Sequence, residues 1–169
     1  MPVRKGTRAA AGAKSPDAIT LLKTDHKKVR GLLEALEKTQ NANRREALSS
    51  QIEQELKIHT QIEEEIFYPA FKEAAKKKDD RVLFWEAKEE HHVVDHVLPE
   101  VRETAPQGEQ YEAMAKVLKD VVLHHATEEE KEMFPRAKKL LSKDELRELG
   151  ARMQQRKSEL QENPRKLNS

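Results

Sequence analysis

The chain has 169 residues, enough for one domain with a single hydrophobic core, and the absence of cysteine excludes disulfides, thiolate metal sites and cysteine nucleophiles. Charged residues make up 37% of the chain and aromatic residues only 4%, a composition typical of long solvated helices rather than sheets. The net charge is +1, but four basic residues lie in the first sixteen positions, so the remainder sums to about −3 (+1 − 4), which argues against a nucleic-acid partner.

The chain begins with a segment that does not look structured. Residues 1–16 are small and basic without hydrophobic periodicity, and we predict a disordered tail. They lack the apolar stretch of a secretory signal, and no later apolar run approaches the roughly 20 residues that cross a bilayer. We therefore expect a soluble cytoplasmic protein with no membrane partner.

Ser15, Pro16 and Asp17 then supply a helix cap, a first-turn proline and a first-turn acid. Apolar residues recur from there at helical spacing, which predicts a first helix over residues 17–39. The sequence NANR at 41–44 breaks this pattern.

The second helix carries an apolar stripe that reaches Pro69. Because proline lacks a backbone N–H and clashes with the preceding turn, we predict that the helix ends or kinks there. We expect the third helix to bend or finish near Pro99 for the same reason. The stripes of the two helices consist of Ala47, Ile52, Leu56, His59, Ile62 and Ile66, then Val82, Phe84, Trp85, His91, Val94, Leu98 and Val101.

A fourth helix follows the break APQG at 105–108, begins near Tyr111 and meets Pro135 as the second helix meets its proline. Ser142 and Glu145 then have the spacing of a capping box, which predicts a short fifth helix.

Four helices joined by short breaks predict an all-α fold, an up-down-up-down antiparallel four-helix bundle over residues 17–140. The additional C-terminal helix and tail, residues 141–169, are expected to lie outside that bundle.

Each of the four bundle helices carries a histidine on its apolar stripe, three, four or seven residues from apolar neighbours. Two of these histidines are followed one turn later by a glutamate on the same face. The inward-facing polar residues are His26, His59, Glu63, His91, His125 and Glu129. The other three histidines, His92, His96 and His124, are turned roughly 100 to 140° away, and we interpret them as flanking residues.

The chain is internally repeated. HTQIEEEIFYP at 59–69 matches HATEEEKEMFP at 125–135, and DHKKVRGLLEAL at 25–36 aligns with EHHVVDHVLPEV at 90–101. Each half is therefore an acid-histidine helix followed by a His-x-x-x-Glu helix, which predicts two hairpins related by a pseudo-twofold axis. Most glutamates of the EEE runs, other than the inward ones, are expected to be solvated.

This inward set indicates a metal. Burying an unpaired carboxylate costs several kcal/mol, and we find no inward Lys or Arg on the stripes to compensate. In each His-x-x-x-Glu, the i, i+4 spacing places imidazole and carboxylate on one helix face. Imidazole and carboxylate together suit iron, manganese or zinc, and two carboxylates that can bridge favour a dinuclear site.

The order of these motifs resembles the hemerythrin-like, or HHE cation-binding, domain over about residues 17–140. The resemblance implies two iron ions bridged by an oxo or hydroxo group and by both glutamates, with a small diatomic or peroxide ligand. It implies iron ligands at His26, His59, Glu63, His91, His125 and Glu129.

Oxygen-carrying hemerythrins use five histidines, with His-x-x-x-His in the third helix and His-x-x-x-x-Asp in the fourth. Here Glu130 follows His125 by five, and the single His-x-x-x-His, His92 with His96, faces away. The leading hypothesis is a non-haem di-iron protein that binds or reacts with oxygen, peroxide or nitric oxide in sensing, storage or detoxification. Whether it is an enzyme is open.

Two alternatives stand beside it. A metal-free or zinc-stabilised helical interaction module would use the same helices. A ferritin-like carboxylate enzyme requires two Glu-x-x-His motifs, and only Glu89 with His92 has that spacing.

Overall fold

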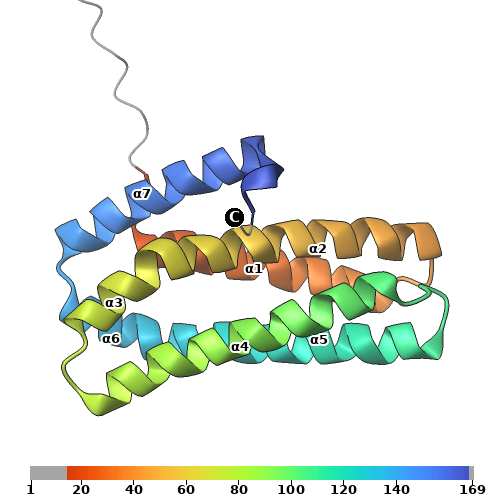
Figure 1. Ribbon diagram of the computed structural model, residues 1–169, viewed down its shortest axis with the longest axis horizontal. Helices are drawn as coiled ribbons and strands as arrows, with labels where there is room; N and C mark the ends of the chain where they lie inside the picture. Colours follow the sequence, from red (N-terminus) through yellow and green to blue (C-terminus); the bar gives the residue numbers. More distant parts are fainter. Residues whose placement is uncertain (1–14, 168–169) are drawn as a thin grey trace, which may run out of the picture.

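Four long helical segments lie side by side, and a further helix packs against two of them (Figure 1). The computed structural model describes residues 15–167, so the predicted tail over residues 1–16 falls almost entirely outside the described part. Every regular element within that part is helical, which confirms the predicted all-α class. No helix among the described residues is long and apolar enough to span a membrane.

The chain runs along the molecule in α1, returns in α2 and α3, runs out again in α4 and returns in α5 and α6 (Figure 1). Because α1 packs on α2 and α5, and α4 packs on the same two helices, the four segments enclose a common interior. The elements are α1 (Ala18–Lys38), α2 (Ala42–Ile62), η1 (Glu63–Phe67), α3 (Tyr68–Ala74), α4 (Lys78–Glu103), α5 (Glu109–Glu128), η2 (Glu129–Met133), α6 (Phe134–Leu140), α7 (Lys143–Glu162) and η3 (Pro164–Lys166).

Helix starts follow local side-chain chemistry. The N-cap of α1 is Asp17, whose carboxylate accepts a hydrogen bond from the Thr20 N–H at 2.9 Å, so the predicted cap at Ser15 is wrong. The predicted capping box is confirmed: the Ser142 N–H donates to the Glu145 carboxylate at 2.7 Å, and the Glu145 N–H donates to the Ser142 hydroxyl at 3.2 Å.

Of the two outcomes predicted at Pro69 and Pro135, an end or a kink of the helix, the end does not occur. The chain stays helical through Pro69 and Pro135, and a single wider π turn, η1 or η2, precedes each of them. Proline cannot donate to the carbonyl four residues back, so the α-helical pattern is already interrupted there. The Tyr68 N–H donates instead to the Glu63 carbonyl, and Phe134 makes the same i to i−5 bond in the second half. Pro99 lies inside an unbroken α4.

The apolar core is divided into two clusters. One, around Leu22, Ile62 and Phe67, lies toward α3, α6 and α7, and the other, around Leu33 and Leu98, fills the opposite half of the bundle. Ala47, Val82 and Trp85, which we predicted on apolar stripes, are exposed, and the buried positions nearby are Arg45, Ser49, Phe84 and Ala87.

Helix α7 lies outside the four-helix ring but is closely packed against it. Leu146, Leu149, Met153 and Leu160 are buried in the first apolar cluster. At Gly150 the helix approaches the start of α1 so closely that a Cβ atom would lie 2.2 Å from the Pro16 carbonyl oxygen. The contact is with backbone, which cannot move aside as a flexible side chain can.

Gly150→Ala should therefore destabilise the protein, by roughly 1 to 3 kcal/mol, because the new methyl group pushes α7 away from α1. Gly31→Ala is the matched control, since no atom lies within 4 Å of its Cβ position, and it should be neutral or stabilising by up to about 1 kcal/mol. Urea denaturation of both variants measures the difference. Equal stabilities would contradict the close packing of α7.

Candidate metal centre

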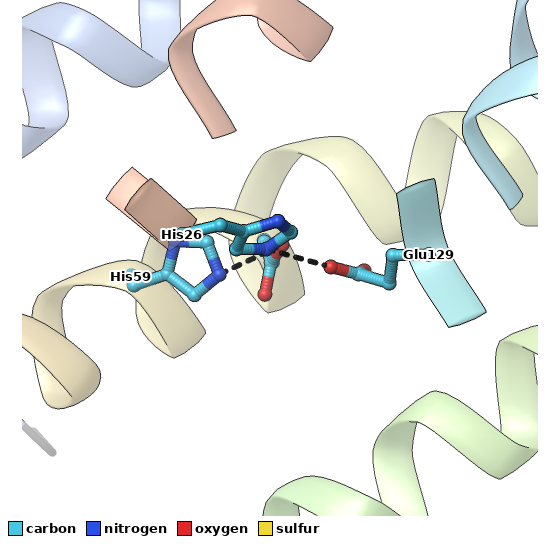
Figure 2. A group of neighbouring side chains, drawn as sticks. His26, His59 and Glu129 are labelled. Atoms are coloured by element: carbon cyan, nitrogen blue, oxygen red, sulfur yellow. Dashed lines mark ion pairs between the residues drawn. The ribbon is translucent and has the colours of Figure 1, made fainter. Parts of the chain in front are cut away.

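The six inward residues predicted from the sequence meet in a layer between the two apolar clusters. They come from six elements: His26 on α1, His59 on α2, Glu63 on η1, His91 on α4, His125 on α5 and Glu129 on η2. All six are buried. Figure 2 shows His26, His59 and Glu129 pointing toward one another from three separate segments.

The potential ligand atoms of these six residues fall into two groups that share one residue. His26, His59, Glu63 and Glu129 form the first group, and Glu63 joins His91 and His125 in the second, with the ligand atoms of each group within 4.8 Å of one another. This spacing is what a bound cation requires.

Glu63 lies between the two histidine pairs. Its Oε1 is 3.2 Å from His59 Nε2, and its Oε2 is 3.3 Å from His91 Nε2. Glu129 has a related position, with Oε2 3.1 Å from His26 Nε2 and 3.6 Å from His125 Nε2. The two carboxylates therefore lie between the histidine pairs, His26 with His59 and His91 with His125, and face both pairs.

Tyr68, which was not among the predicted site residues, belongs to the centre. Its hydroxyl donates to Glu129 Oε1 at 2.9 Å and lies 3.3 Å from His91 Nε2. Burial and the negative charge of Glu129 raise the pKa of the phenol well above its usual value, so it keeps its proton. The repeated aromatic before each proline was the available sign, since Phe134 stacks on His26 as Tyr68 stacks on His91.

Each inward histidine turns its second ring nitrogen, Nδ1, toward an outer carboxylate. Such partners fix the orientation of a metal-binding imidazole and raise its basicity. The pairs are Asp25 with His59 at 3.6 Å, Glu130 with His26 at 2.9 Å, Glu64 with His91 at 3.0 Å and Glu90 with His125 at 2.7 Å.

The expectation was that most of the other EEE glutamates are solvated, and Glu64 and Glu130 do not follow it, since both are only partly exposed and contact histidines. The sequence did contain the sign: an acid directly precedes His26 and His91, and another directly follows each inward glutamate. A base also reaches the centre from outside the stripes of the four bundle helices, because Lys157 of α7 forms a largely buried ion pair with Asp25.

The electrostatics of the metal-free centre are those of ion pairs. Burial lowers the pKa of His59, but the attraction of Glu63 and Asp25 outweighs it and raises that pKa to about 10. Burial likewise opposes the charge on His91, and its contacts with Glu63 and Glu64 raise the pKa to about 9. The hydrogen bond from His91 lowers the pKa of Glu64 to about 2.

Even so, the layer is short of hydrogen bonds. Seven buried side-chain nitrogen and oxygen atoms of the described residues have no hydrogen-bond partner, and all of them belong to Asp25, His26, His59, Glu63 and Glu129. Buried polar atoms without partners are rare because each costs about 1 to 3 kcal/mol. A cation bound by the imidazole and carboxylate atoms would give most of them a partner, so the residues present fit a metal.

The remaining histidines lie at the surface. His92 contacts Glu89, and both are exposed, so the single Glu-x-x-His motif faces solvent and the ferritin-like alternative loses its ligands. His96 is exposed as well. His124 is exposed and lies 3.4 Å from Glu90 Oε1, which places it beyond the outer carboxylates.

Fold and centre together define a helical protein whose interior is built to hold cations. The chain belongs to the hemerythrin family: the model of the hemerythrin HHE cation binding domain matches residues 17–137. Family membership implies that the domain binds cations, and this layer contains buried histidine and glutamate side chains of the kind that bind them.

Similar proteins agree with this assignment. The crystal structure of a hemerythrin HHE cation binding domain-containing protein, the Rv2633c homolog from Mycobacterium kansasii, superposes with a TM-score of 0.74 at 31% identity, covering 91% of this chain and 95% of that one. An uncharacterized Mycobacterium tuberculosis protein is 31% identical over 88% of this chain and 89% of its own length. A Nostoc protein named DNA nickase is 23% identical over 84% of this chain, which spans only 39% of that relative.

The raised histidine pKa values predict a pH dependence for the metal-free protein. A histidine whose pKa is higher folded than unfolded adds stability fully below about pH 6.5 and loses that contribution as the pH rises through its folded pKa. The free energy of unfolding should thus decrease between about pH 7 and the folded values near 9 and 10, by up to about 1.4 kcal/mol per pH unit for each imidazole.

Urea denaturation of chelator-treated protein across this range measures the effect, and His59→Asn should flatten the decrease. Stability that stays constant or rises through the window would show that these imidazoles are not charged in the metal-free fold.

Proposed function

We propose that this protein is a non-haem di-iron protein that binds or reacts with oxygen, peroxide or nitric oxide. The observation that carries the proposal is the position of Glu63, whose two carboxylate oxygens face one histidine pair each. A carboxylate placed this way suits two cations rather than one. Six ligands, His26, His59, Glu63, His91, His125 and Glu129, would hold them.

The donor set is compatible with iron. Four imidazoles and two carboxylates, without thiolates, suit iron, manganese or zinc by ligand type. Iron would supply reversible electron transfer and an open position for a small ligand when bound. The protein's own contribution is to orient each imidazole through Nδ1, to keep a proton on the Tyr68 hydroxyl and to exclude water with the two apolar clusters.

Room for a ligand exists on one side of the centre. A small cavity of about 20 Å³ is lined by all four inward histidines and by apolar walls that include Val29, Leu56, Val94 and Val122. A water molecule needs about 10 to 15 Å³ by this measure, so the cavity fits a molecule of one or two heavy atoms. Its apolar walls suit an uncharged diatomic or peroxide more than a sugar, nucleotide or amino acid.

The alternative of a metal-free helical interaction module leaves the buried atoms of this layer without partners. The free energy of unfolding of such a module would be lowered by several buried polar groups without partners. A zinc-stabilised module uses the same ligands, and metal content distinguishes it from the di-iron proposal.

Protein grown with iron should contain about two irons per chain and absorb in the near-ultraviolet when oxidised. His59→Ala or Glu63→Ala should remove most of this iron, because each deletes a buried ligand. His92→Ala and His96→Ala, which change exposed histidines, should not. Metal analysis after desalting measures the ratio.

A wild-type protein that keeps no stoichiometric metal, or keeps zinc in preference to iron, would refute the di-iron proposal. Loss of iron in the His92 or His96 variants, but not in the His59 variant, would show that α4 presents another face to the metal.

The cavity gives a separate test of ligand size. Val94→Ile adds one methylene to a cavity wall and should weaken nitric oxide or oxygen binding roughly tenfold while iron content stays at two. Val93→Ile makes the same change on the exposed face of α4 and should have no effect. Anaerobic titration followed by absorption gives the affinities, and equal affinities in both variants would exclude this cavity as the ligand position.

A further inference from the structure

We infer that α7 is a working part of the metal centre: Lys157 is a positioning residue that holds Asp25, and Asp25 in turn holds the His59 imidazole. The inference rests on the proposed metal-binding function of His59 and adds a residue from outside the four-helix ring. The chain of contacts runs from α7 through α1 to α2, which are neighbours in Figure 1.

The contacts themselves are buried. Lys157 Nζ is paired with Asp25 Oδ1, and Asp25 Oδ2 faces His59 Nδ1 at 3.6 Å, an ion-pair contact that is too long for a hydrogen bond. The three side chains are largely shielded from water, with 13% of Lys157 exposed and less of the other two. A buried ion pair of this kind loses its balance when one partner is removed, because the other is left as an uncompensated charge.

Helix α7 is itself fixed where Lys157 leaves it. Its apolar residues are buried against the bundle, and Gly150 touches the backbone at the start of α1. Arg156, the residue before Lys157, makes two hydrogen bonds to Glu65 of the η1 turn at 2.7 and 2.9 Å. The backbone of α7 near Lys157 is therefore fixed by contacts with both α1 and η1.

The orientation of the Asp25 carboxylate decides whether it can contact His59. The Nε2 atom of His59 faces the metal position, so the orientation of its ring depends on what Nδ1 meets on the other side. Asp25 can serve His59 only while its second oxygen points inward, and the pairing of its first oxygen with Lys157 fixes that orientation.

The second half of the centre offers an internal comparison. Lys88 Nζ lies 2.9 Å from Glu64 Oε2, and Glu64 Oε1 lies 3.0 Å from His91 Nδ1. That chain of contacts also consists of a lysine, a carboxylate and a histidine, but its lysine comes from α4 itself, one turn before His91. Changing Lys88 should thus affect His91 and leave His59 unchanged.

The test compares Lys157→Met with Lys88→Met, using Lys157→Arg as the conservative rescue and Arg152→Gln as a control that removes a charge from the exposed face of α7. In metal-free protein, NMR of labelled histidines follows solvent exchange of the His59 Nδ1 proton. In a second arm, anaerobic titration with Fe²⁺ resolves the affinities of the two metal equivalents.

Lys157→Met should speed exchange at His59 but not at His91, and should weaken one of the two Fe²⁺ equivalents about tenfold. Lys157→Arg should restore both readouts, Lys88→Met should act on His91, and Arg152→Gln should match wild type. Asp25→Asn should reproduce the Lys157→Met pattern, which keeps the test decisive if that variant folds poorly.

The inference is overturned if His59 exchange or the Fe²⁺ affinities of Lys157→Met equal those of wild type, or if Arg152→Gln has the same effect. Wild-type protein that takes up no Fe²⁺ would refute the proposed function instead, and the exchange measurement on metal-free protein would still decide whether Lys157 holds His59.

Discussion

The structure depends on one constraint, a layer of buried charge in the middle of a helical bundle. Two apolar clusters close the layer from either side, so the four histidines and two glutamates between them are largely removed from water. Without a cation, the layer relies on ion pairs between imidazolium and carboxylate groups and still leaves seven atoms without a hydrogen bond. Burying these charged groups costs free energy that their ion pairs do not fully recover, so the packing of the helices, and not the ion pairs, must bring them together.

The repeat in the sequence explains how so small a protein encloses such a layer. Each half contributes a helix with an acid-histidine pair and a helix with a π turn that begins at the inward glutamate. Asp25 faces His59 and Glu90 faces His125, so each of these acids contacts a histidine of its own half. Glu64 and Glu130 contact His91 and His26, which belong to the other half. The two hairpins are thereby tied across the centre.

Much of this was accessible from the sequence because it depends on spacing along single helices. The face that carries His26 or Glu63 follows from the helical period and its apolar neighbours alone. The outcome at Pro69 could be predicted only as an end or a kink of the helix, because proline interrupts an α-helical bond but does not decide whether the helix stops or widens into a π turn. Glu64 was marked only as the neighbour of an inward glutamate. Its partner His91, like the partner of Lys157, could not be assigned, because each contact is with a residue of another helix and depends on how the helices are rotated against each other.

The departures from twofold symmetry carry the most specific chemistry. Tyr68 places a hydroxyl against Glu129, whereas its counterpart Phe134 offers only a ring, so the proton donor lies on one side of the centre. The lysines that contact the outer carboxylates also differ between the halves, since Lys88 belongs to α4 of the bundle and Lys157 to α7. A symmetric pair of cations would therefore meet unequal surroundings. Because the layer is buried, such differences act through a low dielectric and are only weakly screened, so the two halves would hold their cations with unequal strength.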